Sequence, residues 1–131
     1  MATLFTKIIN GEIPSYRVAE DDKFIAFLDI SPLSAGHTLV VPRKETDYIF
    51  DIEDSDLADM IIFAKRVARA LEQVVPCKRI GVAVLGLEVP HAHIHLVPLN
   101  RESDISFSKE RIRLLPEEFE DLAARIAEKF E

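Results

Sequence analysis

Three of the four histidines of the chain stand in one short run, His91-Ala92-His93-Ile94-His95-Leu96-Val97. In an extended strand, alternate side chains project from the same face, so the three imidazoles would form a row with neighbours about 7 Å apart. The apolar residues between them would pack on the opposite side. An imidazole can act near neutral pH as a nucleophile, general acid, general base or metal ligand. The pattern therefore predicts chemistry on a polar group such as a phosphate ester or anhydride.

Two other interpretations of this run stay open. The histidines could be half-buried strand residues without a chemical role, an explanation that suits a lone histidine better than three in register. They could also hold Zn²⁺ together with His37 from another strand, leaving one position for water. The fold would then have to bring in carboxylates such as Asp29 or Glu88, and no cysteine is near.

Composition limits the classes of protein to which the chain can belong. Its 131 residues suit one hydrophobic core, so we expect a single domain over residues 1–131. Apolar residues make up 48% and charged residues 30%, as in globular proteins. The net charge of −7 repels phosphates, which disfavours nonspecific nucleic-acid binding and attachment to acidic membranes. The longest apolar run, residues 80–87, is far shorter than a membrane span of roughly 18 residues.

The start of the chain and its cysteine content favour a cytoplasmic location. Residues 1–7 show no charged start followed by an apolar block, so we expect no signal peptide. Cys77 is the only cysteine, which excludes a disulfide within the chain.

Hydrophobic periodicity predicts an α+β fold. The expected helices cover residues 3–10, residues 54–75 and a last segment after Pro116. The expected strands cover residues 16–20, 24–29, 37–41, 79–85 and 92–98. These elements predict an antiparallel sheet of about five strands with a long central helix, a short N-terminal helix and a C-terminal helix. In the long helix, the buried stripe would include Leu57, Ile61, Ala64 and Leu71.

The histidine run resembles the His-φ-His-φ-His-φ-φ signature of the histidine triad (HIT) superfamily, in which φ is an apolar residue. Residues 5–14 are similar to the opening helix of its Hint-like branch, and residues 26–42 to the half that binds the nucleoside. The resemblance spans about residues 4–99 and leaves a helical extension, about residues 101–131, outside it.

This resemblance implies a nucleotide hydrolase or transferase. The enzyme would act at the α-phosphate of a purine nucleoside phosphoramidate, adenylate or dinucleotide, as a homodimer and without a cofactor or metal. His93 would be the nucleophile and form a transient nucleotidyl-histidine, His95 would contact the phosphate and assist the leaving group, and His91 and His37 would complete a hydrogen-bonded relay. An attacking neutral imidazole also needs a fixed acceptor for its N–H, which a backbone carbonyl could supply.

The resemblance also implies a nucleoside pocket. Asp29 would bind the ribose, because one carboxylate can accept hydrogen bonds from both hydroxyls. As an isolated residue before Ser31-Pro32, it would be interpreted as a turn residue. The positions expected to form or border the base pocket are Leu4, Phe5, Ile8, Phe24, Phe27, Ile30 and Leu39. The homodimer would form through residues 54–75 and the strand that begins near Arg79, because both are apolar and an exposed edge invites pairing.

Three departures from the family pattern affect function. Thr3 and Thr6 stand where many bacterial members have a zinc-binding cysteine pair, so we expect no structural metal. The loop before the histidines is shortened to residues 86–90, and Leu87 and Glu88 cannot donate the hydrogen bonds that the family offers to phosphate. The C-terminal extension is longer than in the simplest members and is expected to shape substrate choice. The alternatives are therefore a nucleotide-binding or scaffolding protein with little turnover and, in third place, a metal-dependent hydrolase.

Overall fold

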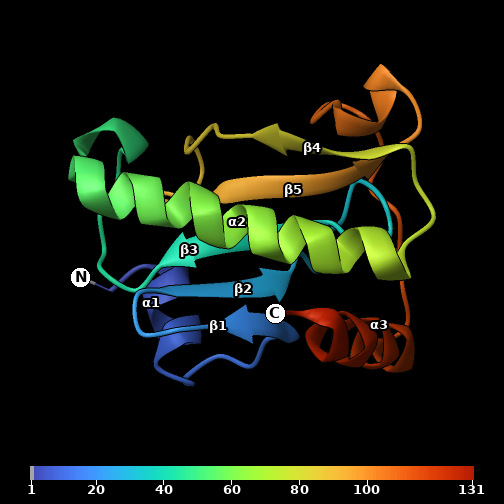
Figure 1. Cartoon of the computed structure of the whole chain (residues 1–131), viewed down its shortest axis with the longest axis horizontal. Coiled ribbons are helices and arrows are strands. Elements are labelled where there is room, and N and C mark those ends of the chain that lie inside the picture. The colour runs from blue at the N-terminus through green and yellow to red at the C-terminus, as the bar shows by residue number, and fades with distance from the viewer. Residues whose placement is uncertain (1) are drawn as a thin grey trace.

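The centre of the molecule is an antiparallel sheet of five strands (Figure 1). The computed structural model describes residues 2–131. The strands pair in the spatial order β1-β2-β3-β5-β4 and are β1 (Arg17–Glu20), β2 (Phe24–Leu28), β3 (Thr38–Pro42), β4 (Arg79–Ala83) and β5 (Ile94–Leu99). The predicted α+β class and the number of strands are confirmed.

Helices cover both faces of the sheet. The long helix α2 (Asp54–Val74) crosses the front face in Figure 1 and lies beside α3 (Pro116–Lys129), whereas α1 (Leu4–Ile9) lies behind. Two short 3-10 turns, η1 (Ile49–Asp51) and η2 (Glu102–Ile105), join these elements. Among residues 2–131, no helix combines the length and the apolar character that crossing a bilayer requires.

The alternation of side chains along β2 explains why helices must cover both faces of the sheet. Phe24, Ala26 and Leu28 belong to the core cluster under α2 and α3. Ile25 and Phe27 point to the other face, where they pack with α1. Since successive strand residues face opposite ways, a strand buried on both sides must be apolar throughout, as β2 is. The smaller cluster on the α1 face lies beneath the candidate site; its buried members are Phe5, Ile8, Ile25, Phe27, Leu39 and Val41.

The prediction that Ile61 lies in the buried stripe of α2 was wrong. The buried residues of this helix are Met60, Phe63, Ala64, Val67, Ala70 and Leu71. Ile61 is 50% exposed and Ile62 is 56% exposed. The helix is turned so that Met60 and Phe63 face the sheet, because α3 packs beside α2 and closes that side of the core.

The last strand begins later than predicted. Residue 92 was expected to open it, but the ladder of β5 starts at Ile94. The N–H of His91 donates to the carbonyl of Val89, and the N–H of Ala92 donates to the carbonyl of Thr46. These two backbone groups are therefore already paired outside the sheet, and only His95 of the three clustered histidines is a strand residue.

Candidate active site

A cavity of about 510 Å³ opens on the α1 face of the sheet. Its volume is typical of pockets for small-molecule ligands. Six of the residues predicted for the site line it: Leu4, Phe5, Asp29, Leu39, His93 and His95. The structure thus brings one carboxylate, two imidazoles and an apolar wall to the same cavity.

The other predicted residues do not line this cavity. Ile8 and Phe27 lie in the packed cluster beneath it, and His37 and His91 are 1% and 0% exposed and contact the site through hydrogen bonds. Ile30 is 74% exposed. Phe24 points to the opposite face of the sheet, where its ring packs on Phe63.

His93 is oriented by its own backbone neighbour. Its Nδ1 atom lies 2.8 Å from the carbonyl oxygen of His91. Because a carbonyl only accepts hydrogen bonds, Nδ1 carries the proton, and the neutral ring keeps a free lone pair on Nε2. The ring of Phe5 packs edge-on against His93, with ring centroids 4.9 Å apart. The backbone acceptor predicted for an attacking imidazole is therefore present.

A second chain of hydrogen bonds orients His95. The N–H of Leu33 donates to Nδ1 of His37 over 3.0 Å, so the proton of His37 is on Nε2. That Nε2 lies 3.0 Å from Nδ1 of His95 and donates to it. His95 in turn carries its proton on Nε2 and can donate a hydrogen bond to a ligand. The relay expected from the sequence is thus two separate chains. The imidazole of His37 orients His95, whereas the backbone carbonyl of His91 orients His93.

Burial keeps these two imidazoles neutral. Loss of water around His37 lowers its pKa to about 3, and neighbouring His95 and Arg111 act in the same direction. Burial likewise lowers the pKa of His95 to about 4. Near neutral pH, both rings therefore act as directional hydrogen-bonding groups rather than as cations.

Gly36 gives the backbone the conformation that places His37 beside His95. Its φ of +95° lies in the region that favours glycine. A side chain here would also place its Cβ 2.9 Å from Cγ2 of Val75 and 3.2 Å from Cγ of Pro98. The backbone therefore passes close to the end of α2 immediately before β3 begins.

Asp29 is both a turn residue and a residue of the candidate site. Its Oδ1 accepts a hydrogen bond of 2.8 Å from the N–H of Ser31, and its Oδ2 lies 3.7 Å from Nε2 of His37. Burial raises the pKa of Asp29, while the Ser31 N–H and the Arg111 charge oppose that shift. Because a carboxylate has about four acceptor positions, Asp29 retains capacity for ligand hydroxyls.

His91 belongs to a hydrogen-bond cluster at the N-terminus of α1. Its Nε2 donates to the carbonyl of Pro42 over 2.8 Å, and its Nδ1 accepts from the hydroxyl of Thr3 over 2.9 Å. The Thr6 hydroxyl donates to Oε1 of Glu45 over 2.6 Å, and the same oxygen accepts from the backbone N–H of Thr3. These bonds lower the pKa of Glu45, the Thr6 hydroxyl contributing most. The cluster joins α1 to the residues that precede β5.

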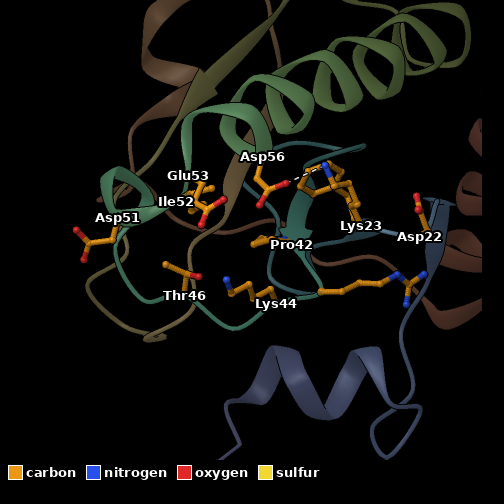
Figure 2. Close-up of a pocket in the computed structure, with 11 residues that line it drawn as sticks. Asp22, Lys23, Pro42, Lys44, Thr46, Asp51, Ile52, Glu53 and Asp56 are labelled. Atoms are coloured by element: carbon orange, nitrogen blue, oxygen red, sulfur yellow. Dashed lines mark ion pairs between the residues drawn. The ribbon is translucent and has the colours of Figure 1, made fainter.

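A second cavity, of about 420 Å³, lies at the start of α2 and is lined mainly by charged residues (Figure 2). Nζ of Lys23 lies 2.8 Å from Oδ1 of Asp56 and 2.7 Å from Oδ2 of Asp59. The single charge of Lys23 is thus already paired with two carboxylates, and no histidine lines this cavity within the described part of the chain. The histidine-lined cavity is therefore the candidate site.

Comparison with known proteins identifies the fold family. A family model described as "HIT domain" matches residues 10–102. The chain belongs to the HIT family. An adenosine 5'-monophosphoramidase of Schizosaccharomyces pombe is 32% identical over 132 residues, covering 98% of both chains. An uncharacterized HIT-like protein of Borreliella burgdorferi is 33% identical over 132 residues, covering 95% of each.

A solved HIT structure agrees with this assignment. The Bartonella henselae structure, described as a Hit-like protein involved in cell-cycle regulation, superposes with a TM-score of 0.83 at 32% identity. The alignment covers 97% of this chain and 95% of that one. The family expected from the histidine run is thus confirmed.

The zinc site of many bacterial HIT proteins does not fit the residues found here. Structural zinc is bound almost entirely by cysteine thiolates and histidine nitrogens. At the positions of the cysteine pair, this HIT domain has the hydroxyls of Thr3 and Thr6, and these are bonded to His91 and Glu45. These hydroxyls are poor zinc ligands, and in this structure they form hydrogen bonds at the N-terminus of α1.

The other group with metal-ligand chemistry is Asp29, His37 and His95, whose ligand atoms lie within 4.8 Å of one another. The two histidines already share one proton between Nε2 and Nδ1 over 3.0 Å. A metal ion would have to replace that proton. The geometry of this HIT domain instead suits a hydrogen-bonded pair.

Two site residues were not identified from the sequence. Phe107 packs edge-on against His95 at 4.7 Å between ring centroids, and Arg111 donates to the carbonyl of Ser31 over 2.6 Å. Both line the cavity and both lie beyond residue 102, outside the part that the HIT model matches. The extension was expected to influence substrate choice, but residues 106–115 form no helix or strand and so gave no periodic signal that singles out individual residues.

Proposed function

We propose that this HIT protein is a nucleotide hydrolase or transferase acting at the α-phosphate of a purine nucleoside phosphoramidate, adenylate or dinucleotide. The observation that supports this most strongly is the 2.8 Å hydrogen bond from Nδ1 of His93 to the carbonyl of His91, which leaves the Nε2 lone pair for attack on phosphorus. The name of the S. pombe relative, an adenosine 5'-monophosphoramidase, favours an adenosine substrate.

In the proposed reaction, Nε2 of His93 forms a bond to the α-phosphorus while the bond from phosphorus to the leaving group breaks. The leaving group departs with that electron pair and takes up a proton from solvent. Water then attacks phosphorus, the N–P bond breaks and its electron pair returns to Nε2. The water proton released to solvent balances the one consumed, so the sum is hydrolysis of the substrate.

Neighbouring residues would bind the substrate in a defined orientation. His95 carries its proton on Nε2 and would donate to a phosphoryl oxygen or to the leaving group. Asp29 would accept hydrogen bonds from the ribose hydroxyls. Leu4, Phe5 and Leu39 form an apolar wall of the cavity and would contact the base.

The test is single-turnover hydrolysis of an adenosine phosphoramidate labelled with ³²P, quenched at short times. We expect a transient, acid-labile label on the protein that is absent from His93→Ala, whose turnover should fall by roughly a thousandfold or more. AMP binding by the variant is the control for folding.

Three outcomes would contradict the proposal. His93→Ala with near-normal turnover would exclude His93 as the nucleophile. Turnover that a chelator abolishes and added Zn²⁺ restores would favour a metal-dependent hydrolase. Tight AMP binding by the unmodified protein without measurable turnover would favour a nucleotide-binding or scaffolding role.

A further inference from the structure

The charges that line the histidine cavity do not match an anionic substrate. Asp29 and Glu88 contribute two carboxyl groups. Among the described residues that line the cavity, Arg111 is the one lysine or arginine. The cavity therefore depends on a single fixed positive charge if it is to hold a phosphoryl group.

Arg111 is positioned by backbone groups at the cavity wall. Its Nη1 donates to the carbonyl of Ser31 over 2.6 Å, and the next residue, Ile112, donates its N–H to the carbonyl of Pro32 over 3.0 Å. Its guanidinium carbon lies 5.6 Å from the centroid of Phe107, a distance at which a cation is attracted to the aromatic ring. Phe107 in turn contacts His95. These contacts hold the guanidinium on the side of the cavity where His95 lies.

The guanidinium keeps hydrogen-bonding capacity for a ligand. It has five N–H donors, and the bond to Ser31 uses one. Within residues 2–131, no carboxylate forms an ion pair with it. An arginine can bind two phosphoryl oxygens at once through a pair of parallel N–H groups.

We infer that Arg111 binds the phosphoryl group of the nucleotide and supplies the affinity for phosphate that the shortened loop at residues 86–90 does not offer. This inference rests on the proposed function, because it takes the cavity to be a nucleotide site. It assigns a role to the C-terminal extension: the extension contributes the cation, and Phe107 and Ser31 position it. The ligand class is a nucleoside carrying a 5'-phosphoryl or phosphoramidate group.

The test compares AMP with adenosine, since the two differ only in the phosphoryl group. Affinities are measured by titration calorimetry for the unmodified protein and for Arg111→Gln, Arg111→Lys and Arg113→Gln. Arg113 is an exposed arginine two residues further along the same segment and serves as the matched control. Thermal unfolding of each variant checks that the fold is intact.

We expect Arg111→Gln to weaken AMP binding about tenfold or more and to change adenosine binding by less than about twofold. Arg111→Lys should recover part of the loss, because it restores the charge without the planar pair of donors. Arg113→Gln should match the unmodified protein. Raising the salt concentration should reduce the difference between AMP and adenosine in the unmodified protein more than in Arg111→Gln.

Other outcomes would overturn the inference. If Arg111→Gln binds AMP as tightly as the unmodified protein, Arg111 is not a phosphate ligand, and the proposed function is unaffected. If Arg111→Gln loses affinity for AMP and for adenosine equally, the residue only supports the packing of the segment. If the unmodified protein binds neither compound, the proposed function and the inference fail together. Failure of the inference alone looks different, because the unmodified protein then still binds AMP.

Discussion

His37 and His95 share a hydrogen bond of 3.0 Å between Nε2 and Nδ1, although 58 residues separate them in the chain. Both rings are more than nine-tenths buried. A proton added to either ring would place a positive charge in a poorly hydrated position next to a second imidazole. The pair is therefore a stable element of the site only while both rings are neutral.

Stability should fall on acidification below about pH 6.5. Burial lowers the pKa of His37 to about 3 and that of His95 to about 4, whereas unfolded histidines titrate near 6.5. Between these values the unfolded chain binds more protons than the folded one, so the free energy of unfolding decreases as the pH falls. The two histidines together should account for roughly 4 kcal/mol of loss between pH 7 and pH 5.

Urea unfolding at a series of pH values checks this expectation. His37→Gln removes one of the two groups and should make the pH dependence shallower, whatever its effect on stability at pH 7. A free energy of unfolding that is constant from pH 7 to pH 5 in the unmodified protein would show that the pair does not control acid stability.

Asp29 should make the site prefer ribonucleotides. If the carboxylate accepts hydrogen bonds from both ribose hydroxyls, removal of the 2'-hydroxyl should weaken binding roughly tenfold. Asp29→Asn keeps an oxygen for the N–H of Ser31 but replaces the other acceptor with a donor, so it should reduce the preference without disturbing the turn. Calorimetry with AMP and dAMP measures both effects. Equal affinities for AMP and dAMP in the unmodified protein would argue against ribose binding by Asp29.

Glu88 should slow turnover of anionic substrates only moderately. It lines the cavity, and its charge contributes to raising the pKa of Asp29, but its side chain is exposed. Solvent screening limits such interactions to about 1 kcal/mol, so Glu88→Ser should accelerate hydrolysis of an adenosine phosphoramidate by at most about fivefold. Glu117→Ser, on α3, is the control for the loss of one surface charge. A slower Glu88→Ser enzyme would instead indicate that the carboxylate orients a histidine or an amine leaving group.

We expect the chain to form a homodimer through the edge strand β4. Within residues 2–131 this strand pairs with β5 alone, and Val82 in β4 and Val84 just after it are 55% and 40% exposed. Ile61, on the neighbouring helix α2, is 50% exposed and would extend the apolar contact. Val82→Lys should shift the protein towards monomers, because a charge at a strand edge opposes pairing.

Sedimentation equilibrium at micromolar concentration measures this shift. Leu115→Lys, at an exposed apolar residue just before α3, should leave the distribution of species unchanged. If the unmodified protein sediments only as a species of 14.8 kDa, the expected dimer does not form under these conditions.

The features that could be predicted from the sequence are local ones. Runs of β-prone residues, with turn residues between them, located all five strands to within about two residues at each end. The spacing of His91, His93 and His95 pointed to the candidate site, because residues so close in the chain lie near one another in any fold. A short motif of this kind also carries the family resemblance, which the match to residues 10–102 confirmed.

Tertiary structure alone decided which distant side chains meet these histidines. His37 reaches His95, Glu45 reaches Thr3 and Thr6, and Arg111 reaches Ser31 only because the chain path brings their segments together. Similarly, the period of α2 was evident in the sequence, but the rotation that exposes Ile61 depends on how α3 and the sheet pack against the helix. Hydrophobic periodicity indicates the secondary structure of one segment. These contacts depend instead on how several segments pack together to bury apolar area, and no single segment contains that information.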